Sequence, residues 1–168
     1  MKDLYVSWDE YNRLIEKLVV KVWDSHYEFD AVICLARGGL RVGDVFSRVF
    51  RKPLGVLFTS SYREKAGTVQ SKLVISKHMS SANDLPMGNW LLVDDLADSG
   101  MTLEQVVPEL KNRYPGVNEV RSAVIWRKGA SVTMPDYELE VLMTNPWIHQ
   151  PFEEYDQVRP EDLKARWG

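Results

Sequence analysis

The sequence has little cysteine and almost no excess of either charge, and each feature excludes a class of function. Its 168 residues include one cysteine, and the formal net charge is −3. A single cysteine cannot form an internal disulfide, and Cys34 lies in an apolar run, which is more typical of a small buried residue than of a nucleophile. The slightly acidic balance argues against non-specific binding of nucleic acid, so we expect no nucleic-acid partner.

Long apolar stretches are also missing. No run approaches the roughly 20 apolar residues needed to cross a bilayer, so we expect no integral membrane segment. The start, Met1-Lys2-Asp3-Leu4, has no signal-peptide core, which predicts a cytoplasmic location. The hydrophobic content of 45% is ordinary for a globular protein, and the length favours a single domain over residues 1–168.

The most informative stretch covers residues 90–103. A short, continuous apolar run, 90–93, leads directly into Asp94 and Asp95, as a buried parallel strand would. Apolar residues then recur at helical spacing from Leu103. The polar residues between them are therefore predicted to lie at the carboxyl end of a strand and to open a helix, where open α/β sheets bind ligands.

The residue types in this stretch suit a phosphorylated sugar. The run 98–102 offers backbone N–H groups at a helix start, and Gly100 allows a phosphate to approach closely. Asp94 and Asp95 would repel a phosphate but suit a cation or sugar hydroxyls. The combination suggests a ribose 5-phosphate site. The alternative is an ordinary loop in which Asp98 or Ser99 only caps the helix.

A second strand–turn–helix pattern lies earlier in the chain. The run 31–35 predicts a buried strand, and Ala36-Arg37-Gly38-Gly39-Leu40 follows it directly. The glycines allow backbone amides to approach an anion, and the arginine adds a fixed positive charge. Because Arg-Gly-Gly is common in turns, this motif is weak by itself.

Hydrophobic periodicity predicts the remaining elements. Ser7-Trp8-Asp9-Glu10 has the form of a capping box, which indicates a helix over about 8–23. Further helices are expected over about 40–50, 101–114 (interrupted by Pro108) and 159–168. Strands are expected over 53–59, 120–126 and 137–143. The segment 145–152, with two prolines and two aromatic residues, is either a plug at the sheet edge or a lid whose aromatic face covers a flat heterocycle.

The stretch 93–102 resembles the donor-binding signature of the type I phosphoribosyltransferases: two acids, two variable positions, then Asp, Thr or Ser, Gly, a variable residue and Thr. Within that family the likeness is greatest to the bacterial xanthine–guanine phosphoribosyltransferases. Five further motifs carry it, namely 5–9, 36–40, 60–62, Ile125-Trp126-Arg127-Lys128 and Trp147-Ile148-His149-Gln150-Pro151. The resemblance implies an α/β fold with a mainly parallel central sheet flanked by helices, a flexible flap over about 60–88 and a small C-terminal hood over about 144–158.

The resemblance also implies how phosphoribosyl diphosphate would bind. Ala36, Arg37, Gly38 and Gly39 would hold pyrophosphate, with a non-proline cis peptide expected between the first two. Asp94 and Asp95 would meet the ribose hydroxyls, and Asp95 would also contact Mg²⁺, the expected cofactor. The 5-phosphate would bind the backbone of Asp98, Ser99, Gly100, Met101 and Thr102. In the flap, Ser61-Tyr62 is the expected leading pair, and Lys77 is expected to reach phosphate when the flap closes.

The family's base-binding roles fall on five positions. Asp98 would steer a proton near N7 of a purine, and Lys128 would donate to the exocyclic oxygen at C6. Trp147 would stack on the purine, while the backbone near Ile148 would accept from its N–H groups. His149 stands where enterobacterial relatives have an acid near C2, and an imidazole cannot reproduce an acceptor-only carboxylate. It is either a surface histidine or a switch of base preference.

The implied reaction transfers the 5-phosphoribosyl group to N9 of a 6-oxopurine (guanine, xanthine or hypoxanthine) and releases pyrophosphate, with Asp98, Asp95 and Arg37 as the catalytic residues. Ala36 and Ser99 replace a frequent serine and threonine of the family, but neither change removes a backbone donor. Two alternatives stay open: a non-catalytic regulator that senses the donor, and a phosphoribosyltransferase for another base. A homodimer or homotetramer is expected from the family.

Overall fold

The computed structural model describes residues 3–62 and 72–168. A six-stranded sheet forms its centre, in the order β4-β3-β2-β5-β6-β7. All neighbouring strands are parallel except β3 and β4, which are antiparallel. The strands are β2 (Ala31–Ala36), β3 (Leu54–Tyr62), β4 (Lys72–Ser81), β5 (Gly88–Ala97), β6 (Val117–Lys128) and β7 (Tyr137–Leu142). The expected mainly parallel α/β sheet is confirmed.

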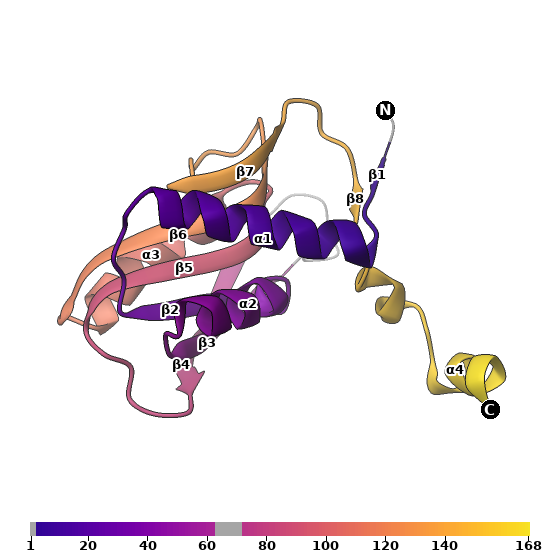
Figure 1. The fold of residues 1–168 in the computed structure, drawn as a ribbon, viewed down its shortest axis with the longest axis horizontal. Helices are drawn as coiled ribbons and strands as arrows, with labels where there is room; N and C mark the ends of the chain where they lie inside the picture. Colours follow the sequence, from indigo (N-terminus) through magenta and orange to yellow (C-terminus); the bar gives the residue numbers. More distant parts are fainter. Residues whose placement is uncertain (1–2, 63–71) are drawn as a thin grey trace.

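Helices cover both faces of this sheet (Figure 1). On one face lie α1 (Trp8–Asp24) and α2 (Leu40–Phe50), and on the other lies α3 (Met101–Arg113). The central strand β5 alternates between the two hydrophobic cores: Leu91 and Val93 pack with α1 and α2, whereas Trp90 and Leu92 pack with α3. A strand whose two faces are both covered has a continuous run of apolar residues. The run 90–93 therefore predicted this buried strand correctly.

The helix boundaries follow local sequence signals. Ser7 caps α1, because its hydroxyl accepts a hydrogen bond from the Glu10 backbone N–H at 3.2 Å. The buried face of α1 repeats at helical spacing from Tyr11 to Val22. Pro108 lies inside α3, but the helix continues unbroken from Met101 to Arg113, so the expected interruption is not observed.

Two strands extend further than their apolar cores indicated. β5 continues through Asp94 and Asp95 to Ala97, because β6 runs alongside it and pairs with it as far as Arg127. β3 reaches Tyr62 and pairs with β4, so the expected flap begins as an antiparallel hairpin. The connection 63–71 lies outside the described residues.

A second, two-stranded sheet was not foreseen. The short strand β1 (Leu4–Tyr5) pairs in parallel with β8 (Ile148–His149), which joins the start of the chain to the expected hood. A short 3₁₀ turn, η1 (Glu153–Asp156), follows, and then α4 (Pro160–Trp167). Figure 1 shows these elements beyond one end of the main sheet. Among the described residues, none of the helices combines the length and apolarity needed to span a bilayer.

Candidate active site

The strands β2, β5 and β6 are parallel and adjacent, so their carboxyl ends meet at one edge of the sheet. The loop after β2 carries Arg37, and β6 ends at Lys128. Asp94 and Asp95 lie near the end of β5, and Asp98 lies in the turn directly after it. Residues predicted separately from three stretches of sequence are therefore brought to a single edge.

The turn between β5 and α3 forms a small cradle. A hollow of about 80 Å³ is lined by residues of this turn and of the end of β5, among them Asp98, Ser99, Gly100 and Thr102. Gly100 has a φ of +79°, and a Cβ there would lie 2.3 Å from the Ser131 hydroxyl oxygen. Glycine is therefore required both by the backbone conformation and by the packing of the neighbouring loop.

The loop 36–40 packs against the end of β5 through its glycines. A Cβ on Gly38 would lie 2.6 Å from a carboxylate oxygen of Asp95, and one on Gly39 would lie 2.7 Å from the Leu35 carbonyl oxygen. The peptide bond between Ala36 and Arg37 is cis, as expected. Both glycines thus allow the loop to approach the two acids directly.

The two acids at the end of β5 have different surroundings. Burial, and then the charge of Asp95, raises the pKa of Asp94 well above its usual range. Asp95 accepts a hydrogen bond of 2.5 Å from the side-chain amide of Gln150, and its backbone N–H donates to Asp94 at 2.9 Å. Gln150 is a buried residue of the hood, so the hood is linked directly to the acid pair.

Lys128 and Asp98 form an ion pair at the edge of the site. Their Nζ and Oδ1 atoms are 3.2 Å apart, with the lysine side chain 9% exposed and the aspartate 66% exposed. The ammonium group is thereby held at the carboxyl end of β6, while the aspartate stays open to solvent. This contact joins two residues that the family resemblance assigns to one edge of a purine, at N7 and at the oxygen on C6.

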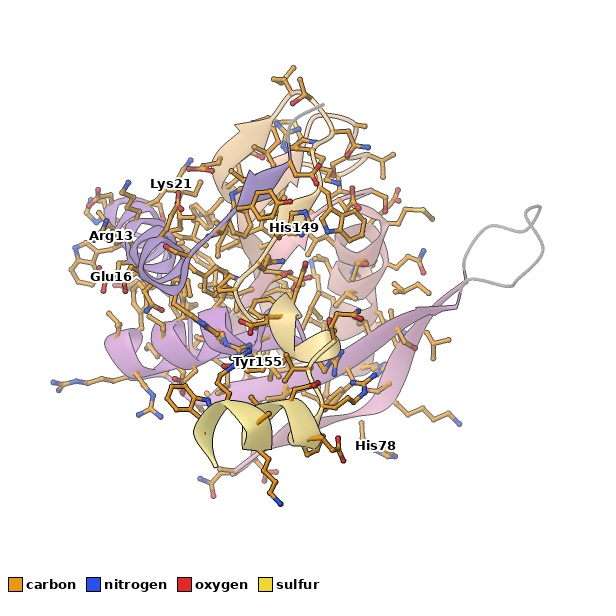
Figure 2. The ribbon with its side chains drawn as sticks, turned by 90° about the vertical axis from the view of Figure 1, so that its right-hand side faces the viewer. Arg13, Glu16, Lys21, His78, His149 and Tyr155 are labelled. Atoms are coloured by element: carbon orange, nitrogen blue, oxygen red, sulfur yellow. The ribbon has the colours of Figure 1, made fainter. Side chains whose placement is uncertain are left out.

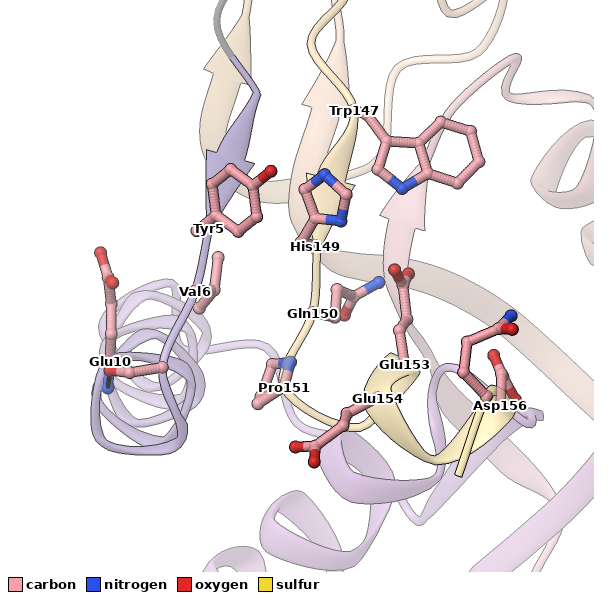
Figure 3. A pocket seen from close by; sticks show the side chains of 12 residues that line it. Tyr5, Val6, Glu10, Trp147, His149, Gln150, Pro151, Glu153, Glu154 and Asp156 are labelled. Carbon is pink, nitrogen blue, oxygen red and sulfur yellow. Dashed lines mark hydrogen bonds between the residues drawn. The ribbon is translucent and has the colours of Figure 1, made fainter. Parts of the chain in front are cut away.

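The hood presents aromatic and imidazole side chains above this edge (Figure 2). The Trp147 side chain is 61% exposed, whereas Ile148 is buried. His149 stacks on Tyr5, with ring centroids 4.2 Å apart, and its Nε2 atom lies 3.0 Å from Asp3. Figure 3 shows the Tyr5 and His149 rings side by side, with Trp147 beyond His149, along a hollow of about 870 Å³. Trp147 is thus an open aromatic surface rather than a buried plug.

Arg37 is exposed and contacts the hood. Its guanidinium lies 3.4 Å from the Asp156 carboxylate, with 80% of the arginine side chain exposed. A hollow of about 470 Å³ separates loop 36–40 from η1, and Glu153 also lines it. Burial raises the pKa of Glu153, which faces the hollows on both sides of η1.

Not every expected residue joins this group. Lys77 is exposed on β4, where its backbone carbonyl accepts a hydrogen bond from Arg113, and within the described residues no ion pair joins it to the loops. Ser61 and Tyr62 belong to β3, but their side chains, like that of Lys72, lie outside the described part. The flap contacts stay predictions.

Sequence reasoning missed several residues that complete the site. Gln150 belongs to the quoted tail motif, yet nothing in the pattern indicated that it would bond to Asp95. Asp3 and Tyr5 contact His149 only because β1 pairs with β8. Both strands are two residues long, so no pattern in the sequence predicts this pairing. Cys34 fits its expected structural role, since burial raises the pKa of its thiol to about 12.

Comparison with known proteins identifies relatives of this chain. The family model described as a phosphoribosyl transferase domain matches residues 7–157. A xanthine-guanine phosphoribosyltransferase of Desulfotalea psychrophila is 27% identical over 155 residues, which cover 90% of this chain and 87% of the relative. The predicted resemblance is confirmed.

Solved structures agree. The crystal structure of a purine phosphoribosyltransferase from Pyrococcus horikoshii has 31% sequence identity and a TM-score of 0.75, covering 95% of this chain and 99% of that one. A Helicobacter pylori xanthine-guanine-hypoxanthine phosphoribosyltransferase has the same TM-score at 24% identity, covering 97% and 99% of the two chains, and shows the same fold.

Proposed function

The chain belongs to the phosphoribosyl transferase family, and on this premise we propose that it transfers the 5-phosphoribosyl group of phosphoribosyl diphosphate to N9 of a 6-oxopurine. The observation that carries the choice of acceptor is the Lys128–Asp98 ion pair, and the exposed Trp147 ring of the hood supports it. On a 6-oxopurine, O6 and N7 are neighbours. A buried ammonium group and an exposed carboxylate 3.2 Å apart suit a donor to O6 and a partner for N7.

The proposed roles on the donor side use the loops at the sheet edge. Backbone N–H groups of 98–102 would bind the 5-phosphate, and Arg37 with Gly38 and Gly39 would bind the diphosphate. Asp94 and Asp95 would accept from the ribose hydroxyls. When Arg37 takes up diphosphate, its exposed contact with Asp156 is the one that must open.

The reaction needs no protein nucleophile under this proposal. The sugar would develop oxocarbenium character as the diphosphate leaves, and catalysis would come from positioning and from charge. Asp98 would hold or move the proton at N7, while Gln150 would fix the Asp95 carboxylate through their hydrogen bond. The hood and flap would exclude water from the reacting sugar.

Magnesium fits the donor set of this site. Two adjacent carboxylates, one of them against the Gly38 backbone, offer the hard oxygen ligands that the ion prefers. Bound there with the donor, it would neutralise charge on the departing diphosphate. We propose Asp95 as its protein contact, and we expect a chelator of divalent cations to abolish turnover.

The remaining parts of the proposal follow from the family. We propose a cytoplasmic role in purine salvage and a homodimer or homotetramer. Base preference is assigned to His149, whose ring is held by Tyr5 and Asp3. A ring nitrogen that accepts would favour the 2-amino group of guanine, and one that donates would favour the 2-oxo group of xanthine.

One assay tests the function. Pyrophosphate release is measured with Mg²⁺, phosphoribosyl diphosphate and a panel of free bases: guanine, xanthine, hypoxanthine, adenine, orotate and uracil. Release with a 6-oxopurine, and not with the other bases, is the expected result. Release only with adenine or a pyrimidine would assign another acceptor, and donor binding without turnover would indicate a regulator.

A further inference from the structure

Arg41 is a fixed positive charge close to the diphosphate loop. It is the second residue of α2 and is half-buried. Its guanidinium carbon lies 5.0 Å from the centre of the Trp8 ring and 4.6 Å from that of Phe152. The first of these rings opens α1 and the second belongs to the hood, so two other elements hold the arginine.

The charge of Arg41 is not matched by a carboxylate. Within the described residues, no Asp or Glu lies within 4.0 Å of its guanidinium, whereas Arg48 of the same helix pairs with Asp44 at 2.8 Å and Arg37 pairs with Asp156 at 3.4 Å. Contacts with aromatic rings stabilise a cation, but they leave its in-plane N–H groups without acceptors. A half-buried arginine of this kind is prepared to bind an anion.

The place of Arg41 indicates which anion. It lines the hollow of about 470 Å³ that Arg37, Gly38 and Asp95 also line. This hollow opens onto the loop proposed to hold the diphosphate. Arg37 reaches it with an exposed side chain from the loop, while Arg41 reaches it from the helix that follows.

We propose that Arg41 is a second cationic contact for the diphosphate of the phosphoribosyl donor, held in position by Trp8 and Phe152. This assignment rests on the proposed function. A guanidinium held by rings on two other elements loses little conformational freedom on binding, so its hydrogen bonds to an anion are gained at low entropic cost. Arg37, which is exposed and paired with an acid, lacks this preorganisation.

A purely mechanical role is the competing explanation. Arg41 could simply clamp the hood to α1 and α2 through Phe152 and Trp8. A clamp would support every ligand that touches the hood, including the purine. A diphosphate contact would affect only ligands that carry a diphosphate or pyrophosphate group.

Calorimetry distinguishes the two roles. Binding of inorganic pyrophosphate with Mg²⁺, of phosphoribosyl diphosphate and of guanosine 5′-monophosphate is measured for the parent protein and for Arg41→Gln, Arg41→Lys and Arg48→Gln. The nucleotide fills the base, ribose and 5-phosphate sites without a diphosphate. We expect Arg41→Gln to weaken pyrophosphate and donor binding about tenfold or more, with nucleotide binding within about twofold. Arg41→Lys should recover part of the loss, and Arg48→Gln should match the parent.

Other outcomes overturn specific statements. Equal losses for pyrophosphate and nucleotide would make Arg41 a clamp, and unchanged pyrophosphate binding in a folded Arg41→Gln protein would remove it from the site. Should Arg41→Gln fail to fold, Arg41→Met removes the charge but keeps a long side chain to pack on the two rings. A folded Arg41→Met variant that binds pyrophosphate as the parent does, or that loses nucleotide binding equally, would also reject the contact. A parent protein that binds neither donor nor pyrophosphate would reject the proposed function itself.

Discussion

The donor half and the base half of the proposed site differ in how many parts of the chain build them. The donor half consists of the loop 36–40 and the stretch 94–102, which is the end of β5 with the turn that follows it. Glycines in both let the chain pack closely against neighbouring groups. The base half combines Lys128 from β6, residues 147–149 of the hood and Asp3 and Tyr5 from the start of the chain. Apart from the backbone near Ile148, the base half depends on side chains.

This difference determines how each half responds to amino-acid substitution. A loop that uses backbone N–H groups tolerates side-chain replacement, provided that its glycines stay, as Ala36 and Ser99 illustrate. A side-chain site changes its ligand whenever a single donor or acceptor is altered. We therefore expect substitutions in the donor half to affect all bases equally, and those in the base half to separate one base from another.

The strongest test of this comparison lies where the two halves meet. Replacing Asp98 by Asn removes the carboxylate proposed to act on N7, and we expect kcat to fall about 100-fold with donor binding nearly unchanged. Steady-state kinetics together with calorimetry of the donor would measure both quantities. Unchanged turnover would show that Asp98 is not a catalytic residue.

A somewhat smaller effect is expected inside the base half. Lys128→Ala should weaken binding of 6-oxopurines about tenfold, because the donor to O6 is lost, while donor affinity stays near the parent value. The comparison uses the KM for guanine and the Kd for phosphoribosyl diphosphate. Equal losses of affinity for guanine and for phosphoribosyl diphosphate would identify Lys128 as a phosphate ligand. Lys128 would then belong to the donor half as well as to the base half.

Within the donor half, Asp94 offers a test by pH. Its raised pKa in the folded protein means that the charged carboxylate destabilises the fold as pH rises from the unfolded value, about 3.9, through the folded value. Asp94→Asn should therefore raise the free energy of unfolding at pH 7, and this gain should vanish at low pH. Urea denaturation at several pH values measures it. A variant less stable at pH 7 would contradict the assigned cause.

The smallest expected effect concerns the N-terminal strand. Asp3→Asn removes the carboxylate beside His149, and we expect the ratio of kcat/KM for guanine and xanthine to change about threefold, with pyrophosphate binding unaffected. Glu28→Gln, at the other end of the sheet, is the matched control. A ratio equal to that of the parent would show that His149 does not set base preference and is a surface histidine.

Sequence reasoning worked best where the determining contacts are local. The capped start of α1, the apolar run of β5 and the turns bearing Arg37 and Gly100 are all indicated by residues that are close together in the sequence. Strand ends were less accurate, since β5 runs on through Asp94 and Asp95 only because β6 continues beside it.

What the sequence by itself determined is the chemistry of the donor loops, because glycine, helix starts and apolar periodicity act over short distances along the chain. The tertiary structure alone decided which distant side chains meet. Gln150 bonds to Asp95 across 55 positions and His149 lies beside Asp3 across 146, while Arg41 is held between Trp8 and Phe152. Such contacts arise when packed elements bring remote segments together, and no local pattern encodes that pairing.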